Sequence, residues 1–351
     1  MEKNGKIENV FLLGNGFNYS IRDFIEDKNL KNEINKIINL WEEFAQFFSE
    51  IKNMDEYESL SDENIIDIIH KSISLLGLLP LINNKNLEKC LEKIKTEFFN
   101  KINDKLLNIV EKFVEIEESG IYKQIANFYH NHTEYNFYKF IEENKISIYT
   151  TNYDGIAEII FAYDKDEISE NKIKLRDMFG YGDYYYNAFD FNNYFRDENE
   201  SKLLHLHGSY KFFSYQGDFI KIKKEGWYFY RKNKDMLSPI LIFNAPGLKE
   251  KQIKNFSVLS VYFKSFEREL TKAKNLIIWG QSLKNDPHIE KIIKELFIKN
   301  NEIRERNLII IDKENIHKIQ KHWENKTPIF INPQSFENLE DLIKEIERKM
   351  N

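Results

Sequence analysis

Cysteine is almost absent from this sequence, since Cys90 is the only one among 351 residues. A single thiol can form neither an internal disulfide nor a zinc site built from several thiolates, so neither holds the fold together. Long apolar runs are also missing. The longest nearly apolar stretch, Leu75 to Ile82, is far shorter than the ~20 residues that span a bilayer. The charged start, Met1 to Asn9, lacks the cleavage pattern of a signal peptide. We therefore expect a cytoplasmic protein with no membrane partner.

An excess of positive charge is absent too. Lys and Arg number 51 against 57 Asp and Glu, which gives a net charge of −6 and a pI near 5.9. Nucleic acid is therefore not an expected partner, because general binding to polyanions needs a basic surface. Hydrophobic residues make up 42% and charged residues 31%, a mixture that can bury a large core and excludes wholesale disorder.

The first part of the chain predicts a strand, a glycine turn and a series of helices. Val10 to Leu13 is a short apolar run that ends at Gly14. An amphipathic pattern follows from about Ser20 to Phe48, and Ser20 with Asp23 suggests a capping box at its start. Residues 61–140 space Ile, Leu and Phe by three to four, which predicts a helical insertion.

The second part of the chain alternates strands with helices. That alternation indicates an α/β fold with a Rossmann-like, mostly parallel sheet that has helices on both faces, in addition to the helical insertion. We expect residues 1–50 and 144–351 to form the Rossmann-like domain and residues 51–143 the insertion. Residues 179–195 suggest an irregular cover, and residues 210–230 suggest hairpins that turn at Gly217 and Gly226. The expected strands are 146–150, 203–207, 239–243, 276–279, 308–311 and 328–331.

The first candidate site is the turn Gly14-Asn15-Gly16-Phe17. A strand that ends in Gly-x-Gly lets the backbone approach a phosphate closely, and the start of the following helix favours an anion. The third glycine of the usual dinucleotide fingerprint is missing, and a structural turn explains two glycines equally well.

The second candidate site is the polar run Thr150 to Gly155, placed where an apolar strand ends. Open α/β sheets bind ligands beyond the carboxyl ends of their strands, so these side chains can point into a crevice. Ordinary capping of the next helix by Asp154 is the alternative. Capping explains one residue of the run and leaves Thr151 and Asn152 unexplained.

The third candidate site is Leu204-His205-Leu206-His207-Gly208. In a strand the two histidines share one face and the two leucines the other. A metal pair is conceivable, but no third ligand stands at a recognisable spacing, and we expect no metal. His207 suits a general base, since the usual pKa of histidine, ~6.5, permits proton transfer near neutrality. A hydrogen-bonded core histidine is the alternative.

The fourth candidate site follows another apolar strand, at Gly280-Gln281-Ser282. Ser282 and the nearby amides can hold phosphate or ribose hydroxyls. Asp286 is expected to cap a helix that begins at Pro287. Asp312 stands after the strand 308–311, where a carboxylate can accept hydrogen bonds from ribose hydroxyls.

The order of these motifs resembles the sirtuin-like domain of bacterial defence proteins. The motifs are Gly14-Asn15-Gly16-Phe17, Thr151-Asn152-Tyr153-Asp154, His207-Gly208 and Gly280-Gln281-Ser282-Leu283. The Gly-Asn-Gly-Phe opening is similar to that of the AbiH-type abortive-infection branch and of related sirtuin-like proteins. The resemblance covers residues 10–25 and 146–333, whereas the expected insertion carries no recognisable motif.

The resemblance implies chemistry on NAD. Sirtuin deacetylases carry a four-cysteine zinc module and a Gly-Ala-Gly opening, whereas this chain has one cysteine and Asn15 in place of the alanine. Relatives that lack the zinc module hydrolyse NAD to nicotinamide and ADP-ribose. The implied activity is that of a sirtuin-like NAD glycohydrolase (NADase), with NAD as substrate and no metal, in an abortive-infection response to phage. The implied catalytic residues are Asn152, His207 and Asp154, and the NAD-binding residues are Gly14, Asn15, Gly16, Phe17, Thr151, Gly280, Ser282 and Asp312.

A non-catalytic module that senses NAD or ADP-ribose derivatives would carry the same motifs. The enzyme reading also leaves room for a homo-oligomer or a partner defence protein that completes the site. The aromatic stretch Tyr181, Tyr184, Tyr185, Tyr186 and Phe189 fits a lid over a base, and it fits packing or an oligomer contact better.

Overall fold

The structure is a computed structural model, and it describes residues 7–52, 64, 100–131, 135–162, 175–196, 200–242, 248–299, 305–313, 323 and 327–351. Cys90 and a large part of the expected helical insertion lie outside these residues. In the described part of the chain, no helix has both the length and the apolar composition needed to cross a membrane.

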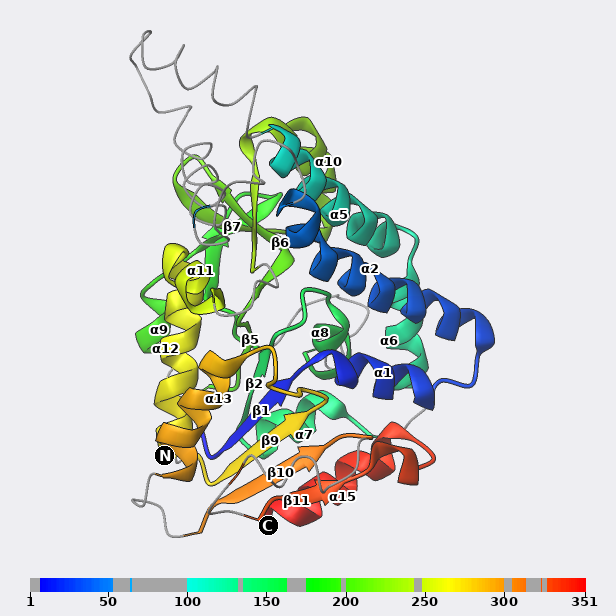
Figure 1. The fold of residues 1–351 in the computed structure, drawn as a ribbon. Helices are drawn as coiled ribbons and strands as arrows, with labels where there is room; N and C mark the ends of the chain where they lie inside the picture. Colours follow the sequence, from blue (N-terminus) through cyan, green and yellow to red (C-terminus); the bar gives the residue numbers. More distant parts are fainter. Residues whose placement is uncertain are drawn as a thin grey trace, which may run out of the picture.

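A six-stranded sheet forms the centre of the molecule, and every pair of neighbouring strands in it is parallel. The strand order is β11-β10-β9-β1-β2-β5 (Figure 1). Four of the six strands are buried along their whole length, which is typical of a sheet covered on both faces. The strands are β1 (Asn9–Leu13), β2 (Ile146–Thr150), β5 (Leu203–His205), β9 (Asn275–Trp279), β10 (Asn307–Ile311) and β11 (Ile329–Ile331).

Helices cover both faces of this sheet, as the sequence predicts. Phe11 of β1 contacts aromatic rings of α7 and α8, whereas Tyr149 of β2 hydrogen-bonds to Ser265 and Glu269 of α12 on the other face. Figure 1 shows α12 in yellow on one side and the blue α1 on the opposite side. The longer helices are α1 (Asn15–Phe24), α2 (Lys28–Lys52), α5 (Asn100–Glu118), α6 (Ile121–Asn131), α12 (Ser257–Lys272) and α15 (Leu339–Met350).

Shorter helices and single turns complete the covering layers. The shorter α-helices are α7 (Phe137–Glu143), α8 (Ile156–Phe161), α9 (Asn193–Arg196), α10 (Trp227–Lys232), α11 (Lys249–Asn255) and α13 (Pro287–Ile293). The 3-10 turns are η4 (Lys224–Gly226), η5 (Lys234–Met236) and η7 (Pro333–Ser335), and a π-helical turn, η6 (Lys294–Ile298), extends α13.

A second, antiparallel sheet of five strands corrects the predicted irregular cover at residues 179–195. Its order is β3-β4-β7-β6-β8, and α5 packs against β6 and β8. Part of the aromatic stretch packs against α10, because Tyr185 stacks on Phe229 of that helix with ring centroids 5.8 Å apart. The strands are β3 (Phe179–Gly182), β4 (Tyr186–Phe189), β6 (Gly208–Tyr215), β7 (Asp218–Ile222) and β8 (Ser238–Leu241).

Two local predictions near the start of the chain are wrong. The single helix predicted from about Ser20 to Phe48 is in fact two helices. The first, α1, begins earlier, at Asn15, and a break at residues 25–27 separates it from α2. Ser20 therefore lies inside α1 and donates to the carbonyl of Gly16, so it caps nothing. Near Gly226 the chain also departs from prediction. A hairpin does turn at Gly217, between β6 and β7, but Gly226 ends η4 and leads into α10.

The described part of the expected insertion is helical. It consists of the end of α2 and of α5, α6 and α7. The helix α6 packs on α8, next to the parallel sheet, whereas α5 contacts the antiparallel sheet. The boundary between a domain at 1–50 and 144–351 and an insertion at 51–143 stays a prediction.

Candidate functional site

The strand order places a topological switch point between β1 and β9. From β1 the chain proceeds outward through β2 to β5, and it then returns to build β9, β10 and β11 on the other side. Ligands of open α/β sheets bind beyond the carboxyl ends of the strands at such a point. The two glycine motifs follow these two strands, so the switch point is where Gly14 meets Gly280.

Glycine is required here because two backbones touch. A Cβ on Gly14 would lie 2.6 Å from the carbonyl oxygen of Gly280, and a Cβ on Gly16 would lie 2.5 Å from the Cα of Gly280. Gly280 itself has a φ of +63°, in the left-handed region. The amide of Gly14 donates to Trp279 and that of Gly16 to Gly280. Both amides are therefore engaged in joining the two loops.

Asn152 follows β2, and its side-chain amide reaches the same switch point. Its Nδ2 donates to the carbonyl of Gly14 and to Oδ1 of Asn18, both at 3.2 Å. Its Oδ1 is shielded from solvent and has no hydrogen-bond partner. Asn18 in turn donates to Asp154 at 2.7 Å. These contacts bring the first two motifs of the sequence into one buried network.

Asp154 has the structural role that capping predicts, together with a second one. One carboxylate oxygen accepts the amide of Ile156 at the start of α8, and the other accepts the Asn18 side chain. Burial raises the pKa of Asp154 above its ordinary value, although both hydrogen bonds oppose that shift.

His205 is a hydrogen-bonded core histidine. Its Nδ1 lies 2.8 Å from the carbonyl of Asn152, and its Nε2 lies 2.8 Å from the Glu158 carboxylate on α8. Burial alone would raise the pKa of Glu158, but the charge and the hydrogen bond of His205 lower it to about 2. Burial opposes protonation of His205, yet Glu158 raises the pKa of the imidazole. Through its contact with the carbonyl of Asn152, the His205–Glu158 pair holds the backbone of Asn152 in place.

His207 has no such partner. It lies in the two-residue link between β5 of the parallel sheet and β6 of the antiparallel sheet, and it is only 1% exposed. Neither ring nitrogen has a hydrogen-bond partner. Burial lowers the pKa of His207 to about 3, with partial opposition from Asp286. The imidazole is therefore neutral at pH 7 and keeps a lone pair on one nitrogen.

Asp286 and His288 face His207 from the start of α13. Nε2 of His207 lies 3.5 Å from Oδ1 of Asp286, and the two imidazole centroids are 5.8 Å apart. Asp286 does not cap α13 through its side chain, contrary to prediction. Its carboxylate instead accepts Lys249 at 2.8 Å and Gln281 at 3.0 Å. Burial disfavours the carboxylate, but the neighbouring charges and the hydrogen bond from Lys249 outweigh that cost, so the pKa of Asp286 lies below its ordinary value.

Gln281 joins the two halves of the site. Its Nε2 donates to Oγ1 of Thr151 at 3.1 Å and to Asp286 at 3.0 Å. Thr151 precedes Asn152, and Asp286 faces His207. The structure therefore brings Asn152 and His207 to one edge of the sheet through Gln281.

The remaining predicted site residues differ in what they can contact. Phe17 is fully buried between Phe161 and Trp279, so its side chain belongs to the core. Oδ1 of Asn15 is shielded from solvent and lacks a partner, whereas Ser282 is exposed. Asp312 follows β10 at the same carboxyl edge and is partly exposed.

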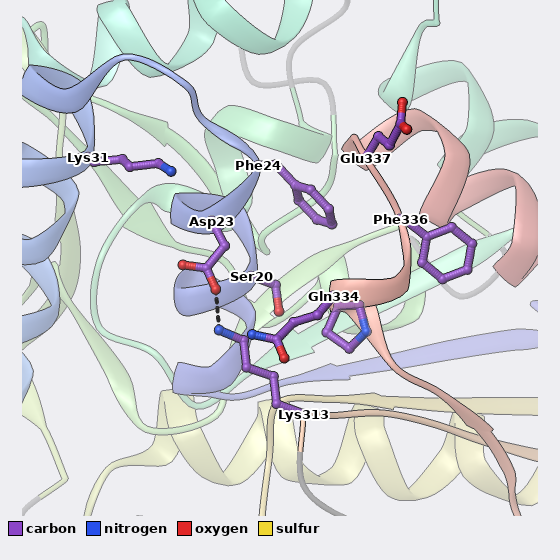
Figure 2. A pocket seen from close by; sticks show the side chains of 9 residues that line it. Ser20, Asp23, Phe24, Lys31, Lys313, Gln334, Phe336 and Glu337 are labelled. Atoms are coloured by element: carbon purple, nitrogen blue, oxygen red, sulfur yellow. Dashed lines mark hydrogen bonds and ion pairs between the residues drawn. The ribbon is translucent and has the colours of Figure 1, made fainter.

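A pocket of about 320 Å³ opens at the carboxyl ends of β10 and β11 (Figure 2). It starts one helical turn from Gly16, where Ser20 accepts the indole N–H of Trp279. Lys313, next to Asp312, forms an ion pair with Asp23 across the pocket. The lining residues are Ser20, Asp23, Phe24, Lys31, Lys313, Pro333, Gln334, Phe336 and Glu337.

The sequence assigns no role to the side chains of four residues of this network, namely Asn18, Lys249, Gln281 and His288, although Gln281 stands inside a candidate motif. Asn18 and Gln281 stand within or beside the glycine motifs, and their polarity next to a predicted turn was the only local signal. Lys249 is 37 residues from Asp286 in the chain, and no spacing rule connects them.

A comparison with protein families agrees with this geometry. The family model of the SIR2-like domain matches residues 146–329, which is more than half of the chain. No curated protein matches the sequence. The matched segment runs from the start of β2 to the first residue of β11, so it contains Asn152, His207 and the loop after β9. The chain therefore belongs to the SIR2-like domain family.

Proposed function

We propose that the protein hydrolyses NAD to nicotinamide and ADP-ribose. The observation that carries this proposal is a group of three buried polar atoms without hydrogen-bond partners, Oδ1 of Asn152 and the two ring nitrogens of His207, at the switch-point edge of the sheet. A buried polar atom without a partner costs about 1–3 kcal/mol, so such atoms indicate a place where a ligand completes the hydrogen bonds. Membership of the SIR2-like family makes NAD the substrate to test first.

The sheet edge offers separate places for the two ends of the dinucleotide. We assign the pyrophosphate to the loops around Gly14 and Gly280, where the positive end of α1 attracts it, since the amides of Gly14 and Gly16 are already bonded within the protein. We assign the adenosine end to the side of Asp312 and the pocket beside Lys313, whose carboxylates and ammonium groups can bind ribose hydroxyls and phosphate. The nicotinamide ribose then lies between Asn152 and His207.

The chemistry needs positioning more than a strong acid. Nicotinamide leaves as a neutral molecule when its bond to the anomeric carbon breaks, and the ribose centre becomes oxocarbenium-like, as in glycoside cleavage. Water then adds to that carbon and gives up one proton. We assign the positioning of the ribose and the water to Asn152, and the proton to the neutral imidazole of His207. Asp154 acts through Asn18, which orients Asn152.

The burial of His207 supports a protein that is silent until its site opens. At 1% exposure the imidazole cannot touch a ribose, so turnover requires movement of the chain that covers it. A partner defence protein or a second copy of the chain is the proposed trigger. The same burial also favours the alternative function, in which the protein binds NAD or an ADP-ribose derivative without cleaving it.

Incubation with NAD tests the proposal, with free nicotinamide measured by chromatography and mass spectrometry. Positioned proton transfer contributes about 10²–10⁴-fold to a rate. His207→Ala and Asn152→Ala should each lower nicotinamide release by about that factor. The exposed Asn131, at the end of α6, provides a matched control, and Asn131→Ala should cleave NAD at the parental rate.

The outcomes separate the two functions. Parental turnover by the His207→Ala protein contradicts the assignment of the base. Saturable NAD binding by calorimetry without nicotinamide release, in the presence of phage-infected lysate as the source of a trigger, supports the sensor instead. Loss of the folded state in a variant is recognised by its urea midpoint and excluded from the comparison.

We assign the biological setting to abortive infection, in which NAD depletion stops phage growth. This assignment rests on the resemblance of the Gly14-Asn15-Gly16-Phe17 opening to defence proteins. Bacteria that express the parental protein should lower phage plating efficiency and lose cellular NAD on infection. Bacteria that express His207→Ala should do neither. Protection without NAD loss would contradict the proposed link.

A further inference from the structure

We propose that His207, Asp286 and His288 form a binding site for a divalent transition-metal ion of the Zn²⁺ class. One ligand atom from each residue lies within 4.8 Å of the other two. Two imidazole nitrogens and one carboxylate oxygen are donors that Zn²⁺ prefers, and three protein ligands with one open position are typical of a reactive zinc site. The sequence pairs His207 with His205 instead, because the other two ligands of the cluster, Asp286 and His288, come from another loop.

The unpartnered atoms point to a ligand that accepts lone pairs. Both nitrogens of the buried His207 lack a hydrogen-bond partner, and so does the solvent-shielded Nε2 of His288. Asp286 by contrast is fully engaged, with one oxygen on Lys249 and the other on Gln281. A cluster that merely packed would leave one imidazole N–H bonded to the nearby carboxylate, and it does not.

The geometry fits a small ion. Ligand atoms about 2.0–2.2 Å from a tetrahedral ion are about 3.3–3.6 Å apart. Nε2 of His207 and Oδ1 of Asp286 are 3.5 Å apart, so this edge is already formed. His288 is only partly buried, and a shift of its ring by about 1 Å would bring ligand atoms that now lie within 4.8 Å of one another to the spacing of a tetrahedral ion.

Lys249 competes with the ion for the same oxygen. Its ammonium lies 2.8 Å from Oδ1 of Asp286, the atom that faces His207. The ion must displace this ammonium, which limits the affinity of the parental protein. An ion in place also occupies the lone pair of His207. It would therefore silence the NAD cleavage proposed above, and this consequence alone rests on the proposed function.

The test measures metal binding directly. The metal-free protein is titrated with Co²⁺, whose visible absorption reports coordination by nitrogen and oxygen in a tetrahedral site, and Zn²⁺ is then added as competitor. We expect saturation at one ion per chain, displacement by Zn²⁺ and no displacement by Mg²⁺. His288→Ala should weaken binding by more than about 100-fold, since even partners outside the ligand shell change affinity by about 10–100-fold.

A second variant keeps the inference open to refutation if His288→Ala fails to fold. Lys249→Met removes the competing cation and should tighten Co²⁺ binding by at least about tenfold. Asn285→Ala changes an exposed side chain directly before Asp286, and this control variant should bind Co²⁺ as the parent does. The proposed metal site is wrong if the parent and His288→Ala bind Co²⁺ with equal affinity, or if folded Lys249→Met binds Co²⁺ more weakly than the parent. Because no NAD is present, failure of the proposed NAD cleavage leaves these readouts unchanged.

Discussion

Replacement of Gly280 by alanine tests whether the switch point requires glycine because two backbones touch. A Cβ on Gly280 would lie 2.3 Å from both the carbonyl carbon of Gly16 and the amide nitrogen of Phe17. Carbon contacts are normally about 3.5–4.0 Å, so the start of α1 would have to retreat by more than about 1 Å. That helix carries Asn18, which orients Asn152.

Two costs contribute to the expected loss of stability. The left-handed backbone at Gly280 costs an alanine about 1–2 kcal/mol, and overpacking typically adds about 1–3 kcal/mol. We expect the free energy of unfolding to fall by about 2–5 kcal/mol in total. Gly120 separates the two costs, because it has a φ of +80° and its Cβ would contact nothing within 4 Å. Gly120→Ala should therefore lose only the backbone contribution, about 1–2 kcal/mol of the free energy of unfolding.

Urea unfolding followed by circular dichroism measures the difference. The midpoint of Gly280→Ala should lie below that of Gly120→Ala, with equal slopes in both, because the slope reports the surface exposed on unfolding. Equal midpoints for the two variants would mean that the loops after β1 and β9 do not depend on close contact. The explanation of the Gly14, Gly16 and Gly280 pattern would then be wrong.

Two buried ion pairs give further predictions. The pKa of Glu158 is about 2 in the folded protein against an ordinary 4.5. Its charge therefore contributes about 3 kcal/mol above pH 4.5, and this is lost as the pH falls toward 2. Between about pH 5 and pH 3, the free energy of unfolding of Glu158→Gln, measured with urea, should fall less than that of the parent. An equal fall in the two proteins would refute the lowered pKa of Glu158. Lys202 and Glu269 are 2.7 Å apart and almost fully buried, so Lys202→Met should cost about 3–5 kcal/mol. Addition of Glu269→Gln should recover part of that loss in the same assay, and additive losses would contradict the pairing.

The parallel sheet could be predicted because its strands carry the signal themselves. Runs such as Val10 to Leu13 and residues 308–311 are apolar along their whole length, since both faces of the sheet are covered. The antiparallel sheet at residues 179–189 could not be predicted in the same way. Its β4 is half-buried throughout, so polar and aromatic residues follow one another without the alternation that marks a strand with one wet face.

The site was predictable only where its residues stand next to strand ends. Asn152 and Gly280 belong to this class, because parallel strands deliver their carboxyl ends to one edge. The role of Asp286 was not predictable. A residue before Pro287 at a helix start is typical of a cap, but a buried Lys249 from another helix takes its carboxylate away from that role. Such a choice between local and distant partners depends on tertiary packing, which no spacing rule contains.

The distribution of hydrogen bonds along the sheet edge separates structure from function. Asp154, His205 and Asp286 are buried, and every one of them has at least two polar contacts that fix it. The ring nitrogens of His207 and Oδ1 of Asn152 lie in the same network and have no hydrogen bond. Both residues stand beside groups that are held in place, His207 beside Asp286 and Asn152 beside Asn18. Truncation of His207 therefore removes no hydrogen bond from the folded state, which is why His207→Ala should keep its fold while it loses whatever the ligand does at this edge.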